Sequence, residues 1–163
     1  MANFSEISKY KNNIISAILE NDLIVRCLAN GECDFLAKPY NGDKKNLIYS
    51  NIFPWRKLPA TQLETKTYIT MEFEAPRINR VNDLFKDTLI HIYLFCHNQL
   101  LRTDYGTRID WLLNAIDELF NESPDFGFGK LEFYSYRGID PSYDHLGYVL
   151  SYRAVDANNS KCG

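Results

Sequence analysis

The sequence predicts an α+β domain in which helices cover one face of a mainly antiparallel, four-stranded sheet. An amphipathic helix pattern occupies residues 5–20, and strand patterns occupy 66–75 and 88–97. A second amphipathic helix follows the second of these strands, and two further strands end the chain. Helices and strands that are grouped rather than strictly alternating are typical of α+β folds. We expect one domain over residues 1–163, with a long loop or arm at 32–65.

The N-terminal pattern, SEISKYKNNIISAILE, forms one apolar stripe at helical spacing. The stripe consists of Ile7, Tyr10, Ile14 and Ile18, with Ile15 and Leu19 on its flank. Ser5 is the expected N-cap of this helix. A second, short helix is predicted from Leu23 to Ala29, because Asn30-Gly31 is a common helix-ending pair.

Residues 32–65 are predicted to be irregular, since they contain Pro39, Asn41-Gly42, Pro54 and Pro59. The segment LIYSNIFPW within them is too apolar for a disordered linker. Connections of this length in a compact domain are usually functional. Two interpretations stay open: a loop strapped over the chain's own core, or an arm docked on a neighbouring chain.

Residues 66–75 alternate strictly, which predicts a strand with one solvated face. The apolar face carries Ile69, Met71 and Phe73, and the other face carries Tyr68, Thr70, Glu72 and Glu74. Pro76 ends this strand. The next strand begins about ten residues later, so we expect an antiparallel hairpin joined by the loop RINRVNDLFKD.

The strand at 88–97 is the expected centre of the fold and is apolar on both faces. One face carries Ile90, Ile92, Leu94 and Cys96, and the other carries Leu89, His91, Tyr93, Phe95 and His97. A face that contains Leu89, Tyr93 and Phe95 is too apolar to be left in water. We therefore expect it to be covered either by the long loop or by another subunit.

The following helix is predicted to begin near Thr103 or Asp104, either of which can act as an N-cap. Its buried stripe contains Ile109, Leu112, Leu113, Ile116, Leu119 and Phe120, and its exposed side contains Arg108, Asp110, Asn114, Asp117 and Glu118. A turn-rich loop at 121–129 leads to strands at 131–138 and 145–155, and PSYD forms the turn between them. The tail, 157–163, is expected to be frayed.

The composition excludes several classes of protein. Lys and Arg number 18 and Asp and Glu number 21, so there is no basic excess to bind nucleic acid. Cys27, Cys33, Cys96 and Cys162 form no CxxC pair, which indicates free thiols in a reducing compartment. No apolar run is long enough to span a bilayer, so we expect no membrane association. Aromatic residues make up 14% of the chain, an enrichment typical of partner surfaces.

No arrangement of residues predicts catalysis, a cofactor or a metal site. His91 and His97 lie about 20 Å apart along one strand, at roughly 3.3 Å per residue, and cannot share a metal ion. The Cys96 thiol points away from both, and no phosphate-binding, zinc-protease or dinucleotide motif is present. We therefore expect no enzyme. Two more distant alternatives are a small-molecule-binding α+β module and an enzyme that uses Cys96 or Cys33.

Three segments together resemble a known family. The strand TLIHIYLFCH, the segment LLRTDYGTRIDWLLNAIDELFN and the final strand HLGYVLSYRAVD are similar to those of the tail terminator proteins of long-tailed bacteriophages. The resemblance is a pattern of elements over residues 8–156 and carries no catalytic signature. The segment LIYSNIFPWRKLP is longer than in the smallest members of that family, which keeps a head–tail connector or neck (head-closure) protein as the alternative.

The resemblance implies a virion protein, assembled in the host cytoplasm, that forms a homohexameric ring at the head-proximal end of the tail tube. Such a ring ends tube polymerisation, joins the tail to the head and lets DNA pass without specific binding. Its partners would be further copies of itself, the tail tube protein and a neck or connector protein. Ring interfaces are heterologous, so each chain needs two different contact patches.

Two sets of residues are the expected sites of this function. The subunit or partner interface is assigned to Phe53, Pro54, Trp55, Leu89, Tyr93, Phe95, Arg102 and Tyr105. Glu72 and Glu74 are assigned to a face that lines the lumen and repels the DNA backbone.

Overall fold

The strand β4 (Phe85–His97) lies at the centre of the sheet, as the apolar pattern predicted. The computed structural model describes residues 4–57, 64–124, 126 and 130–157. The tail predicted to be frayed, 157–163, lies outside the described residues except for residue 157. The side chain of Ser5, the predicted N-cap, is not described either. The other elements are α1 (Phe4–Glu20), α2 (Asp22–Ala29), the short 3-10 helices η1 (Phe35–Ala37), η2 (Lys44–Leu47) and η3 (Asn98–Leu100), β1 (Ile52–Phe53), β2 (Thr67–Phe73), β3 (Arg77–Ile78), α3 (Arg108–Phe120), β5 (Leu131–Ser142) and β6 (His145–Ala157).

The described strands form one six-stranded mixed sheet. The prediction of a mainly antiparallel sheet with four strands was therefore wrong in the number of strands, although the α+β class is correct. The strand order is β1-β2-β4-β6-β5, and β3 pairs with one end of β4. All pairs are antiparallel except β1 with β2. The two additional strands, β1 and β3, are two residues long each, and such short pairings carry no alternating pattern that a sequence could show.

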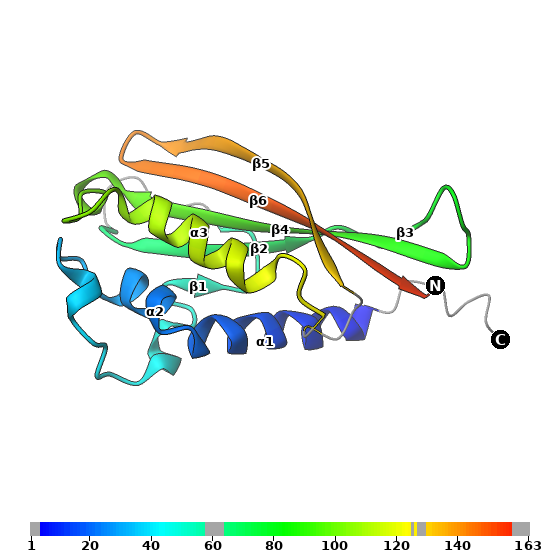
Figure 1. The fold of residues 1–163 in the computed structure, drawn as a ribbon, viewed down its shortest axis with the longest axis horizontal. Coiled ribbons are helices and arrows are strands. Elements are labelled where there is room, and N and C mark those ends of the chain that lie inside the picture. Colours follow the sequence, from blue (N-terminus) through cyan, green and yellow to red (C-terminus); the bar gives the residue numbers. More distant parts are fainter. Residues whose placement is uncertain (1–3, 58–63, 125, 127–129, 158–163) are drawn as a thin grey trace.

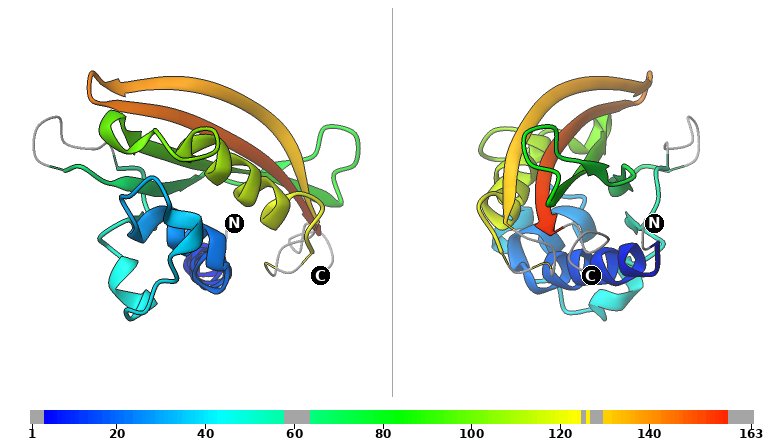
Figure 2. Two further views of the ribbon diagram at one scale, coloured as in Figure 1. Left: turned by 60° about the vertical axis from the view of Figure 1, so that its left-hand side comes forward. Right: turned by 90° about the vertical axis from the view of Figure 1, so that its right-hand side faces the viewer.

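The three helices pack on one face of the sheet, as predicted (Figures 1 and 2). Their apolar stripes meet the strand residues Ile90, Ile92 and Leu94 in a single buried cluster. The helix residues at its centre are fully or almost fully buried: Ile14, Ile18, Ile24, Leu112, Ile116 and Phe120. Complete burial of each such side chain stabilises the fold by about 1.5–3 kcal/mol relative to exposure.

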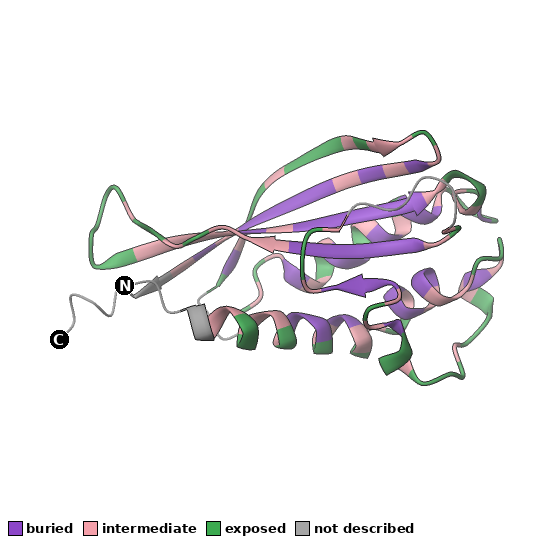
Figure 3. Cartoon of the chain, turned by 180° about the vertical axis from the view of Figure 1, so that it is seen from behind, coloured by how far each residue is buried: buried purple, intermediate pink, exposed green. Residues whose placement is uncertain are grey.

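The β2–β4 hairpin has the predicted antiparallel pairing, with Ile69 opposite Leu94 and Met71 opposite Ile92. Its connection is not a plain loop, because β3 extends the pairing along β4. β4, β5 and β6 are longer than predicted. As a result, the hairpin formed by β3 and the start of β4 projects beyond the helical layer (Figures 1 and 3).

The helix α3 begins at Arg108, so the predicted start at Thr103 or Asp104 was wrong. The Oγ1 atom of Thr103 instead donates to the carbonyl oxygen atoms of Tyr105 and Gly106 and closes a tight turn. Gly106 has a φ of 75°, which favours glycine there. The N-cap is Thr107, whose side chain accepts from the Asp110 N–H.

The long segment after α2 lies on the chain's own core, which decides between the two open interpretations for its described part. β1 pairs in parallel with β2, and Phe35 and Leu47 belong to the buried cluster under the helices. The buried side chain of Asn51 donates to the Leu28 carbonyl at 3.2 Å and to the Thr67 carbonyl at 2.9 Å. The segment therefore joins α2 to β2.

Arg108 is completely buried, whereas the helical pattern predicted that it would be exposed. Its guanidinium group donates to three main-chain carbonyls: Leu100 at 2.9 Å, Cys27 at 3.2 Å and Glu32 at 2.8 Å. The group also lies 4.5 Å from the centre of the Phe35 ring. Burial lowers the pKa of Arg108, but arginine remains charged in proteins. One buried cation thus ties together α2, the segment after it and the turn before α3.

Replacing Arg108 should therefore destabilise the fold strongly. In Arg108→Met, three main-chain carbonyls lose their donor and the buried packing of the guanidinium is lost, and we expect the free energy of unfolding to fall by about 3 kcal/mol. Urea denaturation followed by circular dichroism measures this change. The control is Arg102→Met, at an exposed arginine, which should change stability by less than about 0.5 kcal/mol. Equal stability of the two variants would show that the buried guanidinium is dispensable.

Candidate functional site

The face of the sheet opposite the helices carries a second buried cluster. It contains Phe53, Tyr68, Tyr93, Phe95 and Val149, with Ile139 packed at its edge. Phe95 lies directly opposite Gly147 on β6, and a Cβ on that glycine would be 2.9 Å from the Phe95 ring. The missing side chain of Gly147 therefore makes room for the aromatic ring of its cross-strand partner.

Residues 53–57 of the same chain cover much of this cluster. The guanidinium carbon of Arg56 lies 5.3 Å from the centre of the Tyr93 ring, and Lys57 Nζ lies 4.0 Å from that of Phe53. Trp55 packs edge-on against Phe53, with ring centres 5.5 Å apart. Phe53, Tyr93 and Phe95, all predicted to form a subunit interface, are therefore buried within the chain itself.

Polar side chains continue this face beyond Tyr93. The Tyr93 hydroxyl donates to Glu72 at 2.9 Å, and burial, with this hydrogen bond, raises the pKa of Tyr93. His91 lies between Ser151, at 2.6 Å, and Glu74, at 2.9 Å. Both glutamates assigned to the lumen are thus hydrogen-bonded to neighbouring strand residues instead of facing solvent freely.

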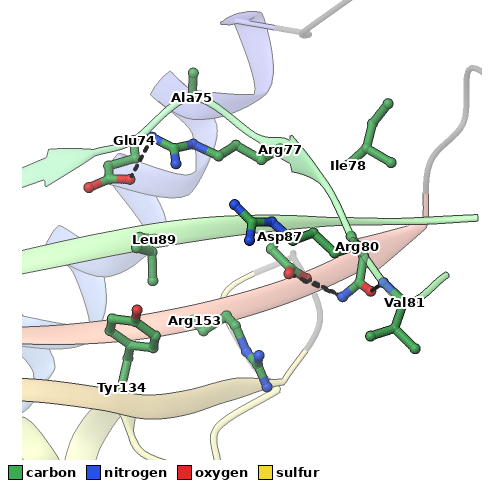
Figure 4. A pocket seen from close by; sticks show the side chains of 11 residues that line it. Glu74, Ala75, Arg77, Ile78, Arg80, Val81, Asp87, Leu89, Tyr134 and Arg153 are labelled. Carbon is green, nitrogen blue, oxygen red and sulfur yellow. Dashed lines mark hydrogen bonds and ion pairs between the residues drawn. The ribbon is translucent and has the colours of Figure 1, made fainter. Parts of the chain in front are cut away.

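A shallow hollow lies at the base of the projecting hairpin, between β3 and the β5–β6 pair (Figure 4). Arg77 and Glu74 form an ion pair at 3.8 Å on one side, and Tyr134 and Arg153 lie on the other. Arg153 in turn donates to Glu132 at 2.8 Å. Leu89, another predicted interface residue, is half-buried in this hollow. Positive and negative groups are mixed here, so the hollow shows no preference for ligands of one charge.

The outer part of the hairpin, which we call the hairpin tip (residues 77–86), exposes apolar side chains. Ile78, Val81, Leu84 and Phe85 are all exposed, and Val81 is 96% accessible. Two asparagines organise the turn that presents them. Asn79 Oδ1 accepts from the N–H groups of Val81 and Asn82, and Asn82 Oδ1 accepts from that of Leu84. Asn79 also donates to both carboxylate oxygens of Asp87 on β4.

The edge strand β5 and the turn after it expose aromatic side chains: Phe133 and Tyr136 on the helix side of the sheet, Tyr134 in the hollow on the other side, and Tyr143 in the turn. Tyr136 stacks on Tyr148 of β6, with ring centres 5.3 Å apart and an interplanar angle of 9°. Exposed aromatic residues that are held rigidly are typical of protein interfaces. Neither the exposed aromatic residues of β5 nor the hairpin tip was predicted from the sequence, although the apolar residues in the loop RINRVNDLFKD could have indicated the tip.

The remaining predicted interface residues lie in two other places. Pro54 is half-buried and Trp55 is 45% exposed, and Trp55 stacks on the exposed Tyr49 at 5.6 Å. Arg102 and Tyr105 are exposed in the turn before α3, at the other end of the molecule from the hairpin tip (Figure 1). The structure therefore does not gather the predicted residues into one site.

The fold brings His97 and His145 together as cross-strand partners, with ring centres 5.0 Å apart. Burial and the neighbouring His97 lower the pKa of His145. Cys96 lies on the helix face, away from this pair, in the first buried cluster. Within the described residues, no group of three His, Cys, Asp or Glu side chains could hold a metal ion. Nor does any described helix have the length and hydrophobicity needed to span a membrane.

Comparison with protein families places the chain in a known family. The model of a phage-related family, YomW, matches residues 21–154, which include every described strand and helix except α1 and the last residues of β6. No curated protein matches the chain.

Tyr93 and Trp55 should respond differently to the same substitution. Tyr93 is 4% exposed, so Tyr93→Asp places a carboxylate in an apolar cluster beside Glu72 and should lower the free energy of unfolding by about 3 kcal/mol. Trp55→Asp, at a half-exposed ring, should cost less than about 1 kcal/mol. Thermal unfolding of the isolated chain compares them. If the Tyr93→Asp chain is as stable as the Trp55→Asp chain, Tyr93 is not part of the internal core, and this face is again a candidate subunit interface.

The cysteines should also differ in reactivity. Burial raises the pKa of Cys27 to about 12 and also raises that of Cys96, whereas Cys33 is exposed. Little thiolate therefore forms at the two buried sites near pH 8. In a Cys162→Ser variant, we expect iodoacetamide to modify Cys33 alone until the protein is unfolded in urea, as measured by peptide mass spectrometry. Rapid labelling of Cys96 in the folded chain would favour the nucleophilic alternative.

Proposed function

The chain belongs to the YomW family, and we propose that it is a structural protein of a bacteriophage that forms a ring at the head-proximal end of the tail tube. In this role it ends tube polymerisation and joins the tail to the head. The phage-related family and the order of elements after the long loop both support the proposal.

The hairpin tip is the observation that carries it. An exposed apolar tip lowers the solubility of a protein unless a partner covers it, so such surfaces mark protein contacts. The Asn79 and Asn82 hydrogen bonds hold the tip in one shape before any partner arrives. Preorganisation of this kind lowers the entropy cost of docking. A rigid projecting element suits assembly into a larger particle.

A ring also needs two different patches on each chain, because its interfaces are heterologous. The hairpin tip lies at one end of the molecule, and β5, which carries exposed aromatic side chains, forms an edge of the sheet (Figure 2). The net charge of −3 suits a lumen that DNA crosses without being bound. Since Glu72 and Glu74 are hydrogen-bonded within the sheet, their repulsion of DNA is a weaker part of the proposal.

A head–tail connector or neck protein is the second candidate. The exposed stacked pair of Tyr49 and Trp55 favours it, since this pair is presented by the long segment between α2 and β2 and is separate from the hairpin tip. A protein placed between two different neighbours needs such an additional surface.

Loss of the protein from the phage that encodes it should separate these roles. If the chain is a terminator, a nonsense mutation in its gene should give tail tubes of irregular, excessive length beside unattached heads, as seen by negative-stain electron microscopy. If it is a connector, the tubes should keep their normal length but remain free of heads. Expression of the wild-type chain in trans is the control, and normal infectious particles without the protein would disprove both roles.

A further inference from the structure

The outward side of α3 is acidic. Its exposed charged residues are Asp110 and Glu118, and the half-buried Asp117 directly precedes Glu118 in the sequence. The only basic residue of α3, Arg108, is buried and faces the core. Asn114 donates to Glu118 at 2.9 Å, so these two residues lie on one stripe of the helix. This stripe therefore attracts cations.

The acidic stripe adjoins the aromatic residues of β5. The Tyr152 hydroxyl donates to Asp117 at 2.8 Å, and the Tyr152 ring packs edge-on against the Phe133 ring, with ring centres 6.1 Å apart. At the other end, burial and the neighbouring Tyr148 raise the pKa of Tyr136, and the carboxylate of Asp110 adds a smaller contribution. We call this combined surface, Asp110, Asn114, Glu118, Phe133 and Tyr136, the α3–β5 face.

The hairpin tip has complementary chemistry. Its apolar side chains are flanked by the exposed guanidinium groups of Arg77 and Arg80. Arg77 is only loosely engaged, by Glu74 at 3.8 Å, and no ion pair among the described residues involves Arg80. Cationic groups beside Val81 and Leu84 would meet carboxylates and aromatic rings on the α3–β5 face, where arginine can both pair and stack.

The two surfaces cannot meet within one chain, because the hairpin projects past the end of the helical layer and away from α3 (Figure 1). We propose that the hairpin tip of one copy docks on the α3–β5 face of a second copy. Each chain then uses one patch of each kind, which makes a head-to-tail contact that is able to close into a ring. The inference rests on the proposed function and identifies the contact by which its ring would form.

Charge reversal tests this pairing. The tip variant carries Arg77→Glu and Arg80→Glu, and the face variant carries Asn114→Lys and Glu118→Lys, so that the capping residues Thr107 and Asp110 are unchanged. In the tip variant the tip and the face are both acidic, and in the face variant two lysines offset the remaining carboxylates of α3 and remove the attraction for the basic tip. We expect its self-association, measured by mass photometry and analytical ultracentrifugation over rising concentrations, to weaken at least about 100-fold relative to wild type.

An equimolar mixture of the two variants should regain assembly, because the acidic tip of the first then meets the new lysines on the second, and the basic tip of the second meets the unchanged acidic face of the first. Native mass spectrometry should show the two variants in equal numbers within each particle. The control, Lys9→Glu with Lys45→Glu, makes the same change in net charge as the tip variant, at exposed sites elsewhere, and should assemble like wild type. Circular dichroism confirms that each variant is folded.

A site-specific cross-link provides a second readout that does not depend on the strength of association. With Val81→Cys and Asn114→Cys in a chain whose Cys33 and Cys162 are serine, a short bis-maleimide should join separate copies into a ladder of oligomers. If both charge variants assemble as well as wild type, the contact is wrong while the ring remains possible. If the wild-type chain stays monomeric and no ladder forms, with or without purified tail tubes, the contact is also overturned, and the gene-loss experiment decides the proposed function separately.

Discussion

The buried guanidinium group of Arg108 is the interaction on which the arrangement of the helical layer depends. Its three acceptors come from the last turn of α2, from the segment that follows α2 and from the 3-10 turn before α3. No carboxylate shares its site among the described residues, so carbonyl dipoles and the Phe35 ring replace the water that the cation has lost. The Cys27 carbonyl also lies near the negative end of the α2 dipole, which favours a cation there. A single side chain thus holds two helices in place relative to each other.

With the helices held in this way, β4 is covered on both faces by its own chain. The helix layer buries Ile90, Ile92 and Leu94, and on the other face Tyr93 and Phe95 are buried in the second cluster, where Arg56 covers the Tyr93 ring. The apolar pattern of this strand predicted two covered faces, and both are covered. The further step, from a covered face to a subunit interface, is not needed to explain the burial of Tyr93 and Phe95. The exposed apolar and aromatic surfaces lie instead where the sheet extends beyond this cover.

The excess length of β4, β5 and β6 over the helices creates those surfaces. At one end the strands continue into the hairpin tip, and at the edge β5 keeps one side without a neighbouring strand in the described part of the chain. The two surfaces differ in shape and charge, since one is a basic apolar projection and the other is an acidic aromatic face. This asymmetry suits repeated head-to-tail association better than a two-fold dimer, in which the same patch must complement itself.

The sequence by itself determined the helices at the N-terminus and after β4, the β2–β4 hairpin and the face on which each central strand residue lies, because these follow from periods of 3.6 and 2 residues. Only the tertiary structure decided that Arg108 is buried, that Arg56 covers the Tyr93 ring, and that Val81 is exposed. Local periodicity places a side chain on a face, but the cover of that face comes from segments distant along the chain. The start of α3 at Arg108 has a similar cause, since the turn from Thr103 to Gly106 is closed by its own hydrogen bonds and the Arg108 N–H donates to the Leu101 carbonyl before it.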